Sequence, residues 1–347
     1  MCGVKSVFIE ISGKCNANCP YCAQVRIKKN NHCGGNTSPI FFKKIIDHLF
    51  TIGIIDKKDL PHINLYNWGE PFLNSNINDI LQILKNNNLR AGISSNFIKL
   101  PDINKELLSV LNNVTFSLSG YSQSSYGKIH GATLKKVIAN FETFCEDVKT
   151  HSPKTKIMIY WHRYLFNEHE FWSMHKKLNR HGISFGSVIA YLNDGIVMKR
   201  FLKDELSEDY IKRVKKDIFL DVIKKDVSNH KKKSKNYRCP QWDSIVIDES
   251  GQLLLCCCVT KYDYDCVLGE VCNMSSEEIW EKKLNHSFCD ECISLGIARF
   301  VHNPNSSLPN GKGLYILKQK FYLNFRKNIG QILEKLPYGK NVISRLS

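Results

Sequence analysis

The chain has 347 residues, of which 43% are hydrophobic and 24% charged, and this composition excludes a disordered or fibrous protein. No apolar run is long enough for a membrane span and the N-terminus lacks a signal-peptide pattern, so we expect a cytoplasmic protein without an integral membrane segment. Fourteen cysteines in such a chain indicate metal or redox chemistry rather than a disulfide framework.

Basic residues outnumber acidic ones, which gives a formal net charge of +16 and a pI of about 9.2. Such a charge favours an anionic partner, whether nucleic acid, a membrane surface or a substrate. The lysines are scattered and are not interleaved with aromatic residues on one element, so nucleic acid is not expected. A general enrichment in Lys, Asn and Ile is the simpler explanation of the charge.

β-like and helical segments alternate over the first part of the chain. Strands are expected at 4–11, 62–67, 90–95, 113–119, 155–161 and 184–191. Amphipathic helices are expected at 39–52, 76–87, 103–111, 133–146 and 167–180. Six such alternations predict an α/β fold with a parallel sheet, open or closed into a barrel, and place function at the carboxyl ends of the strands.

The pattern changes after residue 200. Residues 201–236 form a charged, lysine-rich and helical connector, and residues 237–300 form a small cysteine-rich domain. Within it, the stretch SIVIDESGQLLLCCC predicts a β-hairpin that turns at 249–251. Residues 301–347 form a basic amphipathic helical tail, for which packing on its own domain is favoured over a membrane surface.

Three cysteines lie close together directly after the first strand, in the stretch GKCNANCPYC. The spacing of Cys15, Cys19 and Cys22 lets three thiolates converge on one side of a loop. A [4Fe–4S] cluster takes four thiolates, so three leave one iron open to a small molecule. The alternative is a zinc site that borrows a fourth ligand such as His32 or Cys33.

The loop resembles the signature of the radical S-adenosylmethionine (SAM) superfamily, Cys-x3-Cys-x2-Cys with an aromatic residue, here Tyr21, before the last cysteine. The resemblance implies a partial (β/α)6, TIM-like barrel over residues 1–200. It also implies that SAM chelates the open iron and is reductively cleaved to a 5′-deoxyadenosyl radical that abstracts hydrogen from a substrate.

Short motifs at the expected strand ends support this resemblance. NWGEP at 67–71 resembles Gly-Gly-Glu-Pro, ISSN at 93–96 resembles the Thr-Asn-Gly strand end, and FSLSG at 116–120 resembles Ser-Leu-Asp-Gly. The family pattern then assigns SAM binding to Tyr21, Gly69, Glu70, Ser95, Asn96, Ser117 and His130. Three residues depart from the pattern: Trp68 and Phe97 replace glycines, and Ser119 replaces an acid.

A second set of cysteines follows the connector. Cys239, Cys256 in Gly-x4-Cys, and the pair Cys289 and Cys292 resemble the SPASM/twitch extension, in its one-cluster form because no cysteine follows Cys292. The resemblance implies that these four hold one auxiliary [4Fe–4S] cluster. The sequence leaves open whether a cluster is also bound by Cys257, Cys258, Cys266 or Cys272. A four-cysteine zinc ribbon is the alternative.

These features predict a radical SAM enzyme of the oxidoreductase type, reduced by a flavodoxin or ferredoxin. Only fourteen residues precede Cys15, so a small polar metabolite of sugar or aminocyclitol type is favoured over a peptide. A peptide- or protein-modifying maturase is the alternative, and a structural zinc-binding interaction protein is the more distant one. Tyr160, His162 and Arg163, at the end of the fifth strand, are expected to face the barrel mouth.

Overall fold

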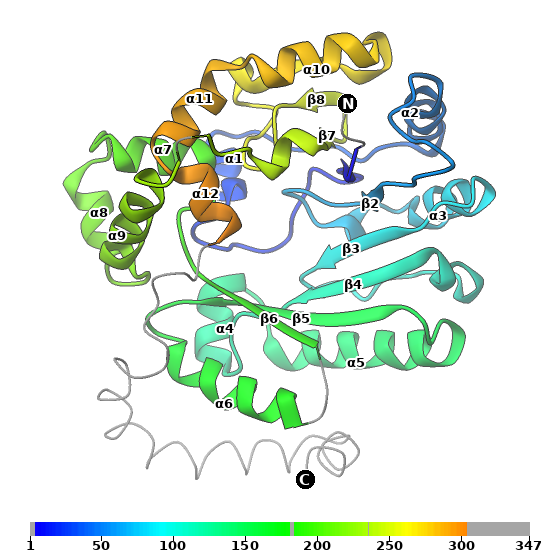
Figure 1. Ribbon diagram of the computed structural model, residues 1–347. Coiled ribbons are helices and arrows are strands. Elements are labelled where there is room, and N and C mark those ends of the chain that lie inside the picture. Colours follow the sequence, from blue (N-terminus) through cyan, green and yellow to red (C-terminus); the bar gives the residue numbers. More distant parts are fainter. Residues whose placement is uncertain (1–3, 181–183, 235, 304–347) are drawn as a thin grey trace.

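The computed structural model describes residues 4–180, 184–234 and 236–303, so the tail expected at 301–347 lies almost wholly outside the described residues. The described residues form one sheet of nine strands in the order β6-β5-β4-β3-β2-β1-β7-β8-β9 (Figure 1). No helix in these ranges is long and apolar enough to cross a membrane.

The first six strands are parallel throughout, each paired with its neighbours in the sheet. They are β1 (Ser6–Ile9), β2 (His62–Asn64), β3 (Ala91–Ser95), β4 (Leu111–Ser117), β5 (Lys156–Arg163) and β6 (Ser184–Ile189). Parallel strands bring their carboxyl ends to one edge of the sheet. The predicted α/β partial barrel is therefore confirmed, with the cysteine loop and the three strand-end motifs at that shared edge.

The helices that follow the parallel strands are α1 (Ala23–Lys29), α2 (Pro39–Thr51), α3 (Ile77–Asn86), α4 (Gln123–His130), α5 (Leu134–His151), α6 (Glu168–Arg180) and α7 (Gly195–Leu202), with the short 3₁₀ helix η1 (Pro71–Leu73). Of these, α2, α3, α5 and α6 lie along the outer side of the sheet, whereas α1 and α7 lie near α12 (Ile297–His302) (Figure 1). In α3 the buried residues recur at helical spacing, at Ile77, Ile80, Leu81 and Leu84. Such a stripe fixes the face that each helix turns to the sheet.

The helix expected at 103–111 is a 3₁₀ helix, η2 (Lys105–Val110), so that prediction is wrong in type. The strand β4 already begins at Leu111, which leaves six residues between the loop and the sheet. Leu107, Leu108 and Val110 are buried in this short space. A segment of this length cannot form the two full turns of an amphipathic α-helix.

The segment after the barrel extends the same sheet, because β7 pairs in parallel with β1. Its strands are β7 (Ser244–Ile247), β8 (Gln252–Leu254) and β9 (Val267–Glu270), and β7 and β8 form the predicted hairpin. Gly251 in the turn has a φ of 85°, which favours glycine. The helical elements here are α8 (Glu208–Val214), α9 (Leu220–Lys231), η3 (Pro240–Asp243), η4 (Tyr264–Cys266), η5 (Val271–Asn273), α10 (Ser276–Leu284), α11 (Ser287–Ser294) and α12 (Ile297–His302).

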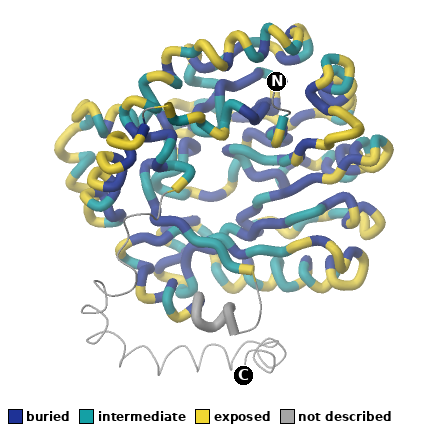
Figure 2. Tube along the Cα trace, viewed as in Figure 1, coloured by how far each residue is buried: buried dark blue, intermediate teal, exposed yellow. Residues whose placement is uncertain are grey.

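Buried side chains are continuous from the barrel into the hairpin (Figure 2). One apolar core runs from the barrel strands to β7, β8 and α10, and a second lies between α7, α9 and α12. The second cysteine set is therefore built onto the edge of the barrel sheet, next to the strand that leads into the first.

Candidate active site

The three cysteines of the first loop lie between β1 and α1, all of them half-buried. The Asn96 side chain donates to the Cys15 sulfur at 3.8 Å, and the Cys19 sulfur lies 3.4 Å from Nδ1 of His130. The loop is thus held from the end of β3 and from the end of α4.

Burial disfavours the charged form of these thiols. Desolvation, with Cys15 nearby, raises the pKa of Cys22 to about 12, and the Cys19 pKa is raised by burial and by both neighbouring thiols. Three half-buried thiols with raised pKa values become thiolates most readily beside a cation, and the iron of a cluster would supply one. The residues present therefore fit an iron–sulfur cluster.

The two residues considered as a fourth zinc ligand, His32 and Cys33, have their described contacts elsewhere. The His32 ring stacks on Tyr262 at 4.0 Å, and the thiol of Cys33 donates to the carbonyl of Gly34.

The motif at 67–71 packs directly against the cysteine loop. The Glu70 N–H donates to the carbonyl of Lys14 at 2.7 Å. A Cβ on Gly69 would lie 1.8 Å from the carbonyl oxygen of Ser12, so only glycine fits this approach. Gly69 and Glu70, which the resemblance assigns to SAM binding, therefore lie directly against the cysteine loop.

The carboxylate of Glu70 joins two of the strand-end motifs. It accepts from the Ser95 hydroxyl and from the Asn96 N–H, each at 2.8 Å. Burial raises the pKa of Glu70 to about 7, against the opposing effect of these hydrogen bonds. Three of the residues assigned to SAM binding, Glu70, Ser95 and Asn96, therefore form one buried cluster beside Cys15.

The two departures from glycine have a structural explanation. Phe97 has a φ of 54°, the left-handed region that favours glycine, and its ring is fully buried among Phe72, Phe116 and Phe141. The aromatic packing offsets the backbone strain of this conformation. Trp68 is buried too, and its indole N–H donates to the carbonyl of Val259 at 2.8 Å.

Neighbouring positions on β4 and β5 face the barrel interior. Ser117 is the register partner of Tyr160, and its hydroxyl lies 3.4 Å from that of Ser94. Alternation along the strand places Tyr160 and His162 on the same face. The hydroxyl of Ser119, which the sequence left uninterpreted, lies 3.3 Å from Nδ1 of His162 and accepts the His162 N–H.

Arg163 points to the other face of β5, so the expectation that it faces the barrel mouth is wrong. Its guanidinium pairs with Glu168 and lies over the ring of Phe171, both in α6. Strand alternation explains the result, because Arg163 is one residue away from His162.

His130 and Tyr21 are held by protein groups. His130 is buried, and burial lowers its pKa to about 3, while its Nε2 has no hydrogen-bond partner among the described residues. The Tyr21 hydroxyl donates to Asp217 at 2.9 Å, between α8 and α9. The structure thus brings His130 to the thiols and turns the Tyr21 hydroxyl towards the connector.

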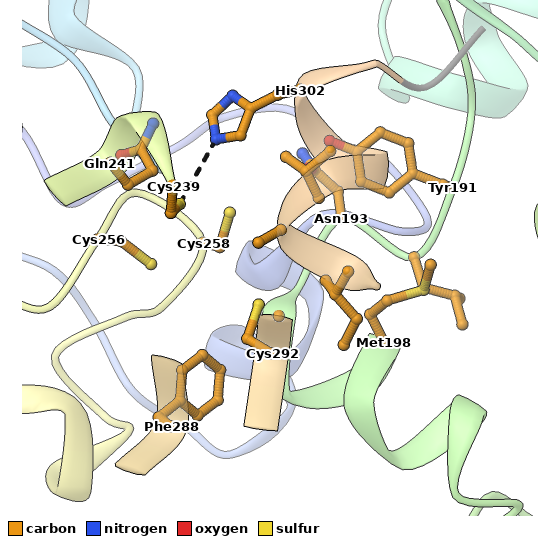
Figure 3. A pocket seen from close by; sticks show the side chains of 15 residues that line it. Tyr191, Asn193, Met198, Cys239, Gln241, Cys256, Cys258, Phe288, Cys292 and His302 are labelled. Carbon is orange, nitrogen blue, oxygen red and sulfur yellow. Dashed lines mark hydrogen bonds between the residues drawn. The ribbon is translucent and has the colours of Figure 1, made fainter. Parts of the chain in front are cut away.

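The second cysteine set surrounds a small cavity of about 40 Å³ (Figure 3). Sulfurs of Cys239, Cys256, Cys258 and Cys292 line it, together with apolar side chains such as Phe288 and Met198. No three Cys, His, Asp or Glu side chains in the described ranges are arranged to hold one metal ion. A cubane differs from a single metal ion in its geometry, because each thiolate would bind a separate iron.

The fourth predicted member of this set, Cys289, lies beside the cavity. Burial raises the pKa of Cys239 to about 12, with contributions from the nearby Cys256 and Cys289. The pKa of Cys292 is also raised by burial, with contributions from all three of these thiols. The four predicted cysteines are therefore mutual neighbours. Cys272 lies elsewhere, in a groove beside α2.

Two buried ionisable residues near these sites were not predicted from the sequence. Lys283 is fully buried, donates to the carbonyl of Leu255 at 2.6 Å and lies within electrostatic range of Cys239, Cys256 and Cys289. Glu10, at the end of β1, accepts the backbone N–H groups of residues 68 and 69. A carboxylate directly after an apolar strand was the available signal for Glu10.

No protein-family model matches the chain, and no curated protein matches its sequence. Solved structures do match. Native anSMEcpe with bound AdoMet (SAM) superposes with a TM-score of 0.51 at 15% identity, over 85% of this chain and 88% of that one. Streptococcus suis SuiB bound to precursor peptide SuiA superposes with a TM-score of 0.54 at 13% identity, over 85% of this chain and 71% of that one.

BtrN in complex with AdoMet and 2-DOIA gives a TM-score of 0.41 at 15% identity, over 88% of this chain and 90% of that one. At these identities the likeness concerns the fold alone, and it is carried by anSMEcpe and SuiB, whose TM-scores exceed 0.5. The fold agrees with the architecture that the cysteine loop and strand-end motifs predict. The chain therefore shares the overall fold of anSMEcpe and of Streptococcus suis SuiB.

Proposed function

We propose that the chain is a radical SAM enzyme that abstracts a hydrogen atom from a small polar metabolite, of sugar or aminocyclitol type, and oxidises it with the help of an auxiliary [4Fe–4S] cluster. One observation carries the proposal: three half-buried thiols, at Cys15, Cys19 and Cys22, adjoin the residues Glu70 and Asn96. A thiol set one ligand short of a cubane, beside polar groups that suit an amino acid, fits a cluster that binds SAM.

In this proposal the first site supplies a 5′-deoxyadenosyl radical when its cluster and SAM are bound. The residues of the chain bind and orient the cofactor. Gly69 leaves space at the loop, Glu70 and Asn96 present polar groups from the segments that follow β2 and β3, and Ser117 presents a hydroxyl from β4. His130, whose Nδ1 lies beside the Cys19 sulfur, has an Nε2 without a partner among the described residues.

The second site would hold the auxiliary cluster through Cys239, Cys256, Cys289 and Cys292, and accept an electron from the substrate. Four thiolates give such a cluster a net negative charge, which is costly in an apolar cavity. The ammonium group of Lys283, buried beside these thiols, would compensate that charge.

Polar groups near the second site support a small polar substrate. Tyr66, Tyr160 and Tyr191 lie within electrostatic range of one another or of Cys257 and Cys258. Burial lowers the pKa of His162 to about 4, so its imidazole is neutral at pH 7 and can exchange a hydrogen bond with a substrate hydroxyl.

The second candidate function is modification of a peptide or protein. It is favoured by the likeness to SuiB, whose structure is bound to precursor peptide SuiA, at a TM-score of 0.54. In either case, a flavodoxin or ferredoxin would supply the electron, and the reducing cytoplasm would suit both clusters. Measuring the release of 5′-deoxyadenosine from SAM in the presence of sugars, aminocyclitols or peptides distinguishes the two functions.

The test is iron and sulfide content after anaerobic reconstitution, for the wild type and a Cys15/Cys19/Cys22→Ala variant. We expect about eight irons per chain in the wild type and about four in the variant. Only the wild type should release 5′-deoxyadenosine from SAM with dithionite. Zinc in place of iron in both proteins would support the structural zinc protein and contradict the proposal.

A further inference from the structure

We propose that Trp68 is a positioning residue that couples the two sites, so that occupation of the second site strengthens SAM binding at the first. The inference rests on the proposed function and extends it. Trp68 is the residue that departs from glycine in the motif beside the first loop, and its two N–H groups bind two different parts of the chain.

The backbone of Trp68 belongs to the first site. Its N–H donates to Oε1 of Glu10 at 2.8 Å, and the N–H of Gly69 donates to the same oxygen. Gly69 lies against the Ser12 carbonyl, and the next residue, Glu70, is bonded to Lys14. A shift of Trp68 therefore moves the residues that adjoin the cysteine loop.

The side chain of Trp68 belongs to the second site. The indole N–H donates to the carbonyl of Val259, which directly follows the three consecutive cysteines 256–258. Val259 is fully buried, and its own N–H donates to the carbonyl of Cys256 at 3.4 Å. Only this short turn separates the indole from a proposed cluster ligand.

The segment 256–266 contains no strand, so ligation of Cys256 is one of the anchors that fix its position. Arg26 of α1 supplies another, through ion pairs with Asp194 and Asp263. When Cys256 is bound, the Val259 carbonyl is fixed and holds the indole in place. If the indole moved away, the buried carbonyl of Val259 would be left without a hydrogen-bond donor, which costs free energy. The hydrogen bond therefore links the position of Val259 to that of Trp68.

The experiment measures the Kd of SAM in four anaerobically reconstituted proteins: wild type, Cys239→Ala/Cys292→Ala, Trp68→Phe, and the triple variant. Coupling between sites is typically fivefold or more in affinity. We expect loss of the second cluster to weaken SAM binding by about fivefold or more in the wild-type background, and by less than about twofold when residue 68 is Phe.

Trp161→Phe is the matched control, because that indole is also buried but its N–H has no hydrogen-bond partner among the described residues. It should keep the full coupling. Equal SAM affinity with and without the second cluster would overturn the inference, as would full coupling in the Trp68→Phe background.

A second measurement needs no variant. Coupling is reciprocal, so SAM should slow or reduce the loss of second-site iron to a chelator in the wild-type protein. No effect of SAM on that iron would overturn the inference even if Trp68→Phe does not fold. Absence of iron from the wild type would instead show that the proposed function itself has failed.

Discussion

The two cysteine sets differ in how far apart in the sequence their members lie. Cys15, Cys19 and Cys22 share one loop of eight residues, and that loop is braced by polar contacts from β3 and α4. The second set comes from three separate segments and meets around a cavity with mostly apolar walls. The first site can therefore be recognised locally, whereas the second depends on the packing of the hairpin, α11 and α12.

Their buried charges differ as well. The first site has two buried carboxyl groups next to it, Glu10 and Glu70, whose pKa values burial raises to about 8 and about 7, and the second has one buried amine, that of Lys283. Carboxylates suit the positively charged amino group of an amino acid, and an ammonium group suits a ring of thiolates. This difference suits the proposed roles, ligand binding for the first region and electron transfer for the second.

The largest effect is expected for Gly69→Ala, which tests how tightly the first site is packed. The added Cβ would meet the Ser12 carbonyl oxygen at 1.8 Å, and that oxygen belongs to backbone that cannot rotate away. We expect a loss of about 3 kcal/mol or more in the free energy of unfolding. Chemical denaturation and iron content check it.

Gly35→Ala is the matched control, because its Cβ would meet only Glu249, at 3.8 Å. That contact is ordinary van der Waals distance, so stability and iron content should hardly change. Wild-type stability in Gly69→Ala would show that the loop and the motif are further apart than described here.

The next effect concerns the membership of the second set. Cys289→Ser should lower the iron content by up to about four per chain, because it removes a proposed ligand. Cys258→Ser, a change of the same size at a residue that lines the cavity, should leave the iron in place. The opposite pattern would make Cys258 the ligand and Cys289 a neighbour.

A smaller effect distinguishes the carboxylates of the first region. Burial and the nearby Glu249 raise the pKa of Glu10 to about 8, above its value in the unfolded chain. The folded state then binds more protons than the unfolded state between about pH 4.5 and pH 8, so this group makes stability fall as pH rises through that window.

Glu10→Gln keeps the oxygen that accepts from residues 68 and 69 and removes the titration. Between pH 6 and pH 8 the wild type should lose about 2 kcal/mol more than this variant. Denaturation curves at both pH values measure it, with the exposed Glu106→Gln as control. Parallel pH profiles for Glu10→Gln and wild type would contradict a buried, protonated Glu10.

Much of this arrangement could be predicted from the sequence because it depends on local pattern. Strand alternation and the spacing of Cys15, Cys19 and Cys22 gave the barrel and the first site. The positive φ of Phe97 and the contact of Trp68 with Val259 could not be predicted, because aromatic packing and a hydrogen bond across 191 residues decide them. Helix α4, which carries His130, was missed for a similar reason: it lacks a strong apolar stripe, with only Ser125, Tyr126, Ile129 and His130 buried.

The smallest effect is expected for Tyr21→Phe, which tests whether the first loop uses its tyrosine for the cofactor or for the fold. The hydroxyl donates to Asp217, whose other oxygen accepts from Lys128 at 2.6 Å. Losing one half-buried hydrogen bond should cost about 1 kcal/mol of stability. The Kd of SAM should stay within about twofold of wild type, since the hydroxyl is already occupied. Tyr264→Phe, at a position 76% exposed, is the control for both measurements. A tenfold weaker Kd without a change in stability would mean that the hydroxyl serves the cofactor, and that the bond to Asp217 is exchanged when SAM binds.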